Sequence, residues 1–246
     1  MKRAACLTVA LLLLWVSAFA ASAAAPAVRG PVAREGQKRV ALTFDDGPHP
    51  QYTAEILDVL AEYGVRATFF VIGKNAKEHP DLVRRELAEG HEVGNHTEHH
   101  YHTGQIGIDT LRRDMEACEQ TLLEITGRRP TLFRPPEGVD NAAIRQTCED
   151  MGYRMILWCV DTRDWAHNPV GNIVAGVERN TTNGSIILMH DWIAEKSPTP
   201  AALRRLIPML QASGYEFVTV SQLLEGQAFS PAPLFRRPAG RSYTAV

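Results

Sequence analysis

The sequence has few cysteines, little net charge and only one long hydrophobic run, and each shortage excludes a class of protein. Its four cysteines, among 246 residues, show no CxxC spacing, which excludes a thiolate zinc knuckle and a dense disulfide framework. A formal charge of −2 gives no support to binding of polyanions through bulk charge, and we expect no nucleic-acid partner. The composition of the whole sequence, 45% hydrophobic and 22% charged, is typical of a globular chain long enough to bury a core.

The one long apolar run lies at the N-terminus. Lys2 and Arg3 precede the apolar residues 4–20, and small residues in an A-x-A pattern follow. This layout is typical of a secretory signal peptide, so we interpret residues 1–23 as a signal and the Ala-, Pro- and Gly-rich residues 24–37 as a linker. The alternative is an uncleaved N-terminal membrane anchor. We expect the mature protein to be secreted or cell-wall associated, with no stable membrane insertion after cleavage.

Strand-like and helical patterns alternate along residues 38–226, which we interpret as one domain. The short apolar runs predict strands at 39–44, 67–72, 92–94, 131–133, 154–160, 185–189 and 217–220. Helical spacing of apolar residues predicts helices at 53–63, 80–89, 110–125, 142–151, 173–179 and 200–212. Six or seven βα units in succession predict an α/β fold with a parallel sheet, open or closed into a barrel. Prolines and arginines after Phe229 predict a mobile tail over 227–246.

Polar residues follow the ends of the predicted strands. They are Asp45 and Asp46, His96, Arg134, Asp161 and Asp164, and His190 and Asp191. In a (β/α) barrel the carboxyl ends of the strands converge on one face, where loops build the site. This placement favours the barrel over the open sheet.

Two motifs carry residues suited to binding a metal ion. Asp45 and Asp46 are neighbouring carboxylates that repel each other unless a cation neutralises them, although Asp-Asp-Gly-Pro is also ordinary turn sequence. His96 and His100 are four residues apart, a spacing that lets two imidazoles bind one metal ion. Joined to Asp46, they form a two-histidine, one-carboxylate set, which is typical of a catalytic metal with open coordination positions.

Three further motifs place ionisable groups near stiff or buried backbone. Arg134 precedes Pro135 and Pro136, which fix the loop and cannot donate hydrogen bonds; the alternative is a surface turn with a solvated arginine. The segments Asp-Thr-Arg-Asp-Trp and Leu-Met-His-Asp each end an apolar run. A histidine at such a place is often a structural core residue, but next to an aspartate and a metal it is better interpreted as a proton donor.

The segments TFDDG, HTEHH, RPPEG, DTRDW and LMH, in this order, resemble the five motifs of the polysaccharide deacetylases, the NodB-homology domain of carbohydrate esterase family 4. The resemblance covers residues 40–224, and five ordered motifs are far more specific than any one of them. It implies a distorted (β/α) barrel of the NodB-homology type, in agreement with the topology predicted above.

The resemblance also implies a role for each motif residue. It implies Asp45 as the general base, oriented by Arg134, and His190 as the general acid, tuned by Asp164. The implied ligands of one divalent metal ion, Zn²⁺ with Co²⁺ or Mn²⁺ as alternatives, are Asp46, His96 and His100. The implied substrate-binding residues are Pro135, Pro136, Glu137, Trp165 and Leu188, of which Trp165 and Leu188 would line a small pocket for the acetyl methyl group.

Glu137 departs from the family pattern, which commonly has an aromatic residue after the two prolines. The backbone amide at this position is implied to help hold the oxyanion, and any residue except proline supplies it. The departure therefore bears on substrate contacts more than on the chemistry.

The resemblance implies metal-dependent de-N-acetylation of N-acetylglucosamine residues in a polysaccharide, with release of acetate. Peptidoglycan is the expected polymer, and the N-acetylated glycan is the expected partner of a monomeric enzyme. One alternative is an O-acetyl esterase acting on xylan with the same site. The other is a non-catalytic carbohydrate-binding protein on the same fold, which predicts a broken site, whereas all seven ionisable motif residues are present.

Overall fold

The computed structural model describes residues 24–32, 36–193 and 196–225. The predicted signal peptide and the predicted tail lie outside these ranges. Within them, no helix is both long enough and apolar enough to cross a bilayer.

The described residues contain eight short strands, which form one sheet with parallel pairing throughout. The order is β5-β4-β3-β2-β1-β7-β6, and β8 pairs with the beginning of β1. The strands are β1 (Arg39–Asp45), β2 (Thr68–Val71), β3 (Glu92–Asn95), β4 (Leu132–Phe133), β5 (Arg154–Met155), β6 (Val160–Asp161), β7 (Ser185–His190) and β8 (Glu216–Phe217). Parallel pairing follows from the alternation of strands with helices, since each crossover returns the chain to the same end of the sheet.

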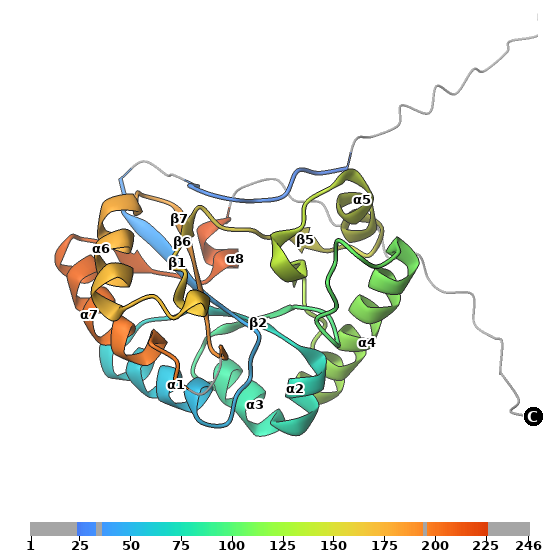
Figure 1. The fold of residues 1–246 in the computed structure, drawn as a ribbon, viewed down its shortest axis with the longest axis horizontal. Coiled ribbons are helices and arrows are strands. Elements are labelled where there is room, and N and C mark those ends of the chain that lie inside the picture. Colours follow the sequence, from blue (N-terminus) through green and yellow to red (C-terminus); the bar gives the residue numbers. More distant parts are fainter. Residues whose placement is uncertain (1–23, 33–35, 194–195, 226–246) are drawn as a thin grey trace, which may run out of the picture.

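Helices α1 to α7 lie around the outside of the curled sheet (Figure 1). The helices are α1 (Tyr52–Tyr63), α2 (Gly73–Glu78), α3 (Pro80–Ala88), α4 (Ile108–Thr126), α5 (Ala142–Asp150), α6 (Val170–Asn180), α7 (Thr199–Ala212) and α8 (Val220–Leu223). Two 3₁₀ turns, η1 (Pro136–Gly138) and η2 (Asp164–Ala166), follow β4 and β6. The expected distorted (β/α) barrel is confirmed as a curled, incompletely closed barrel.

Strand β1 shows how the sheet separates its two faces. Val40, Leu42 and Phe44 belong to the core between the sheet and the outer helices. Because side chains alternate along a strand, Thr43 and Asp45 share the opposite, inner face. The outer face is therefore apolar, while the inner face of β1 ends in an ionisable group.

Two segments of the chain connect the two edges of the incompletely closed barrel. Strands β5 and β6 lie at opposite ends of the sheet order, yet only residues 156–159 separate them. A linker of this length reaches at most about 18 Å when extended, so the two edges must curl toward each other. The second connection is made by residues 24–32.

Residues 24–32 form an N-terminal strap across the space between the two edges (Figure 1). Val28 pairs with Ile156 and donates to the Met155 carbonyl at 2.9 Å, and the N–H of Val32 donates to the Gly184 carbonyl at 2.8 Å. A Cβ at Gly184 would lie within 2.3 Å of the Val32 backbone. The structure therefore packs part of the predicted linker against the domain, and this close approach requires a glycine.

Several predicted elements differ in detail. The run 154–160 forms β5 and β6 with a break between them, and the run 217–220 forms β8 followed by the start of α8. Helix α2 lay outside the predicted helices. The three cysteines among the described residues are free thiols, two of them buried.

Candidate active site

A cavity of about 500 Å³ opens at the carboxyl ends of the strands. It is lined by Asp45, Asp46, His96, His100, Glu137, Trp158, Asp161, Trp165, Leu188 and His190. These residues follow or end β1, β3, β4, β5, β6 and β7, so the topology gathers distant parts of the sequence into one place. The register also pairs the Cα of Asp45 directly with that of His190 on the neighbouring strand.

Arg134 lies beneath the cavity and fixes Asp45. Its side chain is completely buried, and Nη1 donates to Asp45 Oδ1 at 2.7 Å and to Thr43 Oγ1 at 2.8 Å. The other guanidinium nitrogens donate to the carbonyls of Ile156 and Leu157 at 3.3 and 3.2 Å. A guanidinium held on three sides can orient one carboxylate oxygen and leave the other, Oδ2, free for chemistry. The solvated-arginine alternative is wrong.

The carboxylate of Asp46 meets two imidazoles. Asp46 Oδ1 lies 3.3 Å from His96 Nε2 and 3.2 Å from His100 Nε2. Of the residues that the structure describes, these three form the group whose donor atoms all lie within 4.8 Å of one another. Burial alone would raise the pKa of Asp46, but the positive charge of the neighbouring histidines in their protonated form outweighs it and lowers the pKa.

The hydrogen bonds around this group fit a divalent cation. His96 Nδ1 lies 2.7 Å from the carbonyl oxygen of Arg134, which can only accept, so Nδ1 carries the proton. In the neutral imidazole, Nε2 then points a lone pair at Asp46. Oδ1 of Asp46 is buried and has no hydrogen-bond donor among the described residues. Lone pairs that converge on a buried carboxylate oxygen are repulsive without a cation, and a cation makes all three atoms ligands.

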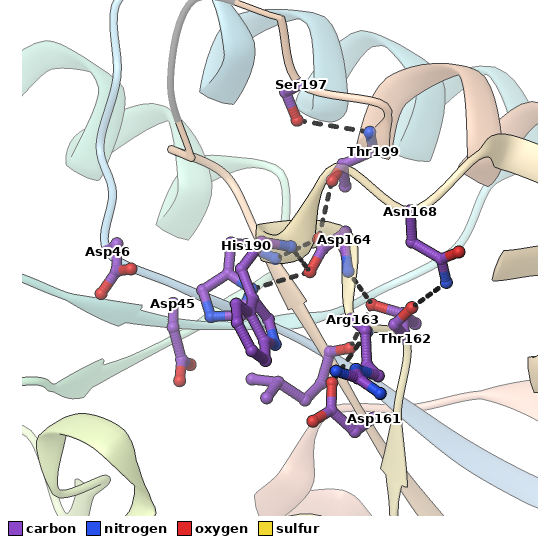
Figure 2. Close-up of polar contacts among 12 residues, drawn as sticks. Asp45, Asp46, Asp161, Thr162, Arg163, Asp164, Asn168, His190, Ser197 and Thr199 are labelled. Carbon is purple, nitrogen blue, oxygen red and sulfur yellow. Dashed lines mark hydrogen bonds and ion pairs between the residues drawn. The ribbon is translucent and has the colours of Figure 1, made fainter.

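His190 is held on the opposite side of the cavity by Asp164. The His190 Nδ1 lies 2.8 Å from Asp164 Oδ1, and the His190 N–H donates to Oδ2 at 2.7 Å (Figure 2). Thr199 Oγ1 also donates to Oδ2 at 2.8 Å. Burial lowers the pKa of His190, but the hydrogen bond and charge of Asp164 outweigh it and raise the pKa to about 9. With Nδ1 engaged, Nε2 is the nitrogen that can exchange a proton in the cavity.

The predicted substrate-binding residues do not all reach the cavity. Trp165, Leu188 and Glu137 line it, and Trp165 is 48% exposed. Pro135 and Pro136 are buried and are not among the lining residues. Glu137 extends over the rim, where its carboxylate pairs with His102 Nδ1 at 2.7 Å. The prolines can therefore act on a substrate only by shaping the loop.

Strained backbone is concentrated in the loops around the cavity. In the described residues, the non-glycine residues with positive φ are Asp46, Thr97, His100, Glu137, Arg163 and His167. Each follows a strand at its carboxyl end. Such conformations cost of order 1–3 kcal/mol each and persist where the surroundings enforce them, which is common at functional sites.

Sequence reasoning missed three residues of this arrangement. Trp158 lines the cavity, and Thr43 and Thr199 complete the hydrogen bonds of Arg134 and Asp164. Asp161, named above only as a polar residue at a strand end, also lines the cavity. Thr43 lies inside a recognised segment, and its position next to a strand end was an available signal. Thr199 begins α7, far along the chain from Asp164, and no local pattern marks it.

Comparisons with known proteins identify the family to which the chain is similar. Residues 33–156 match the family model described as polysaccharide deacetylase. The chain is 43% identical over 190 residues to a peptidoglycan-N-acetylglucosamine deacetylase of Bacillus cereus, covering 76% of this chain and 89% of the relative. It is 40% identical to a chitooligosaccharide deacetylase of Sinorhizobium fredii, covering 75% of this chain and 91% of the relative. It spans only 39% of the length of the peptidoglycan deacetylases of Listeria monocytogenes that it also matches.

The structural comparison gives the same relationship. The structure of the peptidoglycan deacetylase PdaC from Bacillus subtilis superposes with a TM-score of 0.71 at 39% identity. The match covers 78% of this chain and 93% of the PdaC chain.

Proposed function

Since the chain belongs to the polysaccharide deacetylase family, we propose that it hydrolyses N-acetyl groups of N-acetylglucosamine residues in peptidoglycan and releases acetate. One observation supports this most strongly. A carboxylate, a metal-binding triad and a protonated histidine converge on one cavity, each held by its own hydrogen bonds. Together these groups can supply the base, the divalent cation and the acid that a metal-assisted hydrolysis of an amide uses.

The proposed reaction assigns one proton transfer to each side of the cavity. Asp45 accepts a proton from the attacking water, whose oxygen forms the new bond to the acetyl carbon. His190 donates a proton from Nε2 to the nitrogen as the C–N bond breaks. The products are acetic acid, which ionises to acetate, and a glucosamine amine. Asp45 then loses its proton to solvent and His190 takes one up, so both groups return to their starting states. The pKa of about 9 means that His190 carries its proton at neutral pH, as an acid must.

Asp46, His96 and His100 would hold one divalent cation, for which we propose Zn²⁺. When bound, the cation supplies polarisation of the amide carbonyl and a lowered pKa for water. Arg134 and Asp164 are positioning residues in this proposal, because both are fully buried and reach the substrate only through Asp45 and His190.

Two features would place the acetyl group. Trp165 and Leu188 line the cavity beside His190 and offer an apolar surface to the methyl. The N–H of Glu137 donates to no other backbone group of the described residues, and it could donate to the oxyanion. Glu137 itself has a left-handed backbone conformation, with φ of 61°, within the turn η1.

The choice of peptidoglycan rests on the relatives, whose names cover both peptidoglycan and chitooligosaccharide. An enzyme acting on peptidoglycan must work outside the cytoplasm, which agrees with the signal peptide predicted for residues 1–23. An O-acetyl esterase would use the same groups, since ester cleavage needs the same base and cation but relies less on the acid.

Acetate release from purified peptidoglycan, chitin oligomers and acetylated xylan, measured in parallel, tests the proposal. We expect release from peptidoglycan to be fastest, together with free amines in the product. Acetate from xylan alone would favour the esterase, and no release from any of the three would favour a binding protein.

The metal requirement is tested separately. A chelator should abolish acetate release, and Zn²⁺ or Co²⁺ should restore it. His96→Ala should lose bound metal, because two remaining protein ligands hold a divalent ion poorly. Stoichiometric metal in this variant would contradict the ligand assignment.

A further inference from the structure

The loop that carries both imidazole ligands cannot hold its shape alone. Between His96 and His100 the backbone enters the left-handed region at Thr97, with φ of 69°, and again at His100, with φ of 54°. Thr97 is β-branched, a residue type for which this conformation is particularly unfavourable. Contacts outside the loop must therefore keep the two ligands in place.

Two residues between the ligands provide external contacts. His99 contacts the Asp114 carboxylate on α4 through its N–H, at 3.1 Å, and through Nδ1, at 2.6 Å. Glu98 contacts two helices. Its side chain is 5% exposed, although glutamate is seldom buried without a partner. Oε1 accepts a hydrogen bond from Lys77 Nζ at 2.6 Å. Oε2 lies 3.1 Å from Thr121 Oγ1 and shares its hydroxyl proton with the Ala117 carbonyl, which is 3.0 Å from the same oxygen. Lys77 lies on α2 and Thr121 on α4, so one carboxylate joins the loop to both helices.

The backbone of Glu98 is held by the same two helices. Its N–H donates to the Asp114 carbonyl on α4 at 3.1 Å, and its carbonyl accepts from the Lys74 N–H on α2 at 3.0 Å. The neighbouring residue adds a further bond, from the N–H of Gly73 to the Thr97 carbonyl at 3.0 Å. The loop is thus fixed at its middle residue by side chain and main chain together.

Gly73 shows how closely the carboxylate lies against α2. A Cβ at this position would be 1.9 Å from Glu98 Oε2. The φ of Gly73 is not in the left-handed region, so backbone conformation does not require glycine here. The space taken by the Glu98 carboxylate is what requires it.

We propose that Glu98 is a positioning residue for the metal ion. The Lys77–Glu98–Thr121 bridge holds His96 and His100 in the geometry that binds the cation, and its removal weakens metal affinity while the ligands remain present. This proposal depends on the metal site assigned above to Asp46, His96 and His100. Removal of a residue that holds a metal ligand in place typically weakens metal affinity by about 10–100-fold.

The test uses the purified metal-free protein titrated with Zn²⁺ against a chromophoric chelator. We expect Glu98→Ala and Lys77→Met each to weaken Zn²⁺ binding by about tenfold or more. Lys77→Met leaves a buried carboxylate without its cation, which should pull Glu98 toward solvent. Because the two changes break one bridge, the double variant should bind Zn²⁺ about as weakly as either single variant. Its loss of affinity should not equal the product of the two single losses.

Two controls separate positioning from general effects. Lys74→Met removes the same charge from the same helix, but Lys74 bonds to Glu98 only through its backbone. The Zn²⁺ affinity of this variant should therefore stay within about twofold of the wild-type value. Glu98→Gln keeps the length and can still accept from Lys77, so it should restore most of the affinity lost in Glu98→Ala. If Glu98→Ala does not fold, Thr121→Val should show a smaller loss of the same kind.

The Co²⁺ absorption spectrum adds a readout that stability alone does not move. With saturating Co²⁺, Glu98→Ala should show shifted ligand-field bands, whereas Lys74→Met should match the wild type. Wild-type affinity and an unchanged spectrum in Glu98→Ala and Lys77→Met would overturn the proposal while leaving the metal site intact. Absence of Zn²⁺ binding by the wild type would instead overturn the metal site itself, and this proposal with it.

Discussion

Arg134 and Glu86 are two completely buried ionisable residues in different parts of the molecule. They differ in how many hydrogen-bond partners surround their side chains. Arg134, at the carboxyl edge of the sheet, donates to Asp45, Thr43 and two backbone carbonyls. Glu86, in the middle of α3, has neither side-chain oxygen in a hydrogen bond with any part of the chain that the structure describes. Both are 0% exposed.

The difference follows from the backbone around each residue. At the carboxyl edge the strands end, so carbonyl groups such as those of Ile156 and Leu157 are free to accept from a side chain. Within a helix the backbone groups bond to one another and offer a buried carboxyl nothing. Burial raises the pKa of Glu86 well above its usual value, and the buried carboxyl of Asp191 raises it further. Burial of charge therefore indicates function only where partners accompany it.

The largest effects are expected where the buried groups serve the reaction. Asp45→Asn should keep metal and substrate binding but lower kcat by about 10²–10⁴-fold, the usual contribution of a general base. His190→Ala should give a loss of the same size. Steady-state kinetics with metal content measured on the same samples checks both. Near-normal kcat in Asp45→Asn would show that another group takes the proton.

Asp164→Asn should change the pH dependence more than the maximal rate. Asp164 raises the pKa of His190 to about 9, so its removal lowers that pKa. His190 then loses its proton at lower pH, and the alkaline limb of the kcat/KM profile should move down by about one pH unit or more. An unmoved alkaline limb would mean that this limb reports a different group.

Glu137 is intermediate between Arg134, which has several partners, and Glu86, which has none among the described residues. Its carboxylate is exposed and has His102 as its partner. If only its backbone amide serves the chemistry, Glu137→Ala should change kcat by less than about tenfold, because loss of an oxyanion donor costs roughly 10²–10³. KM should move more than kcat, and Glu137→Tyr should be tolerated. A hundredfold fall in kcat for Glu137→Ala, with unchanged metal content, would give the carboxylate a part in the reaction.

Glu86 should have the smallest effect on activity and a measurable one on stability. Its folded-state pKa exceeds that of the unfolded chain, so stability falls as pH rises above about 4.5 toward the folded value. Glu86→Leu should make this decline smaller and stabilise the protein at pH 7 by about 1–3 kcal/mol. Asp191, whose pKa burial raises to about 7, contributes its own part of the decline, which remains. Thermal unfolding at pH 4.5 and pH 7 measures both effects.

The control for this variant is Glu78→Leu, an exposed position at the end of α2. It should not raise the melting temperature at either pH. A lower melting temperature for Glu86→Leu at pH 7 would show that the carboxyl has a partner or a role of its own. An equal gain at both pH values would show that ionisation of Glu86 does not cause the decline.

Much of the fold could be predicted because its strands are continuous apolar runs bounded by turns. Strand β1 is an example, since buried residues cover nearly its whole length. The run 154–160 was predicted as one strand because most of its residues are apolar, and in the structure Ile156 and Leu157 are as buried as strand residues. They pair with the N-terminal strap or the Arg134 side chain, and a pattern of apolar residues cannot distinguish these partners from a neighbouring strand.

The residues of the candidate site also fall into a group that the sequence predicts and a group that it does not. Its ionisable residues could be predicted because each follows an apolar run, where an ionisable side chain is unexpected. The residues that support them could not. Glu98 depends on Lys77 and Thr121, and Asp164 on Thr199, and these partners lie on helices that the fold, not the local sequence, brings near.

The N-terminal strap moves the point at which another protein module can be joined to this one. A fragment beginning at residue 38, where the sequence pattern suggests that the domain starts, would leave the Met155 and Gly184 carbonyls and the Leu157 N–H without their present partners. It would also uncover the apolar cluster around Phe70 and Ile186, against which Val28 and Val32 pack. A fusion should therefore be made before residue 24, so that the strap remains part of the folding unit.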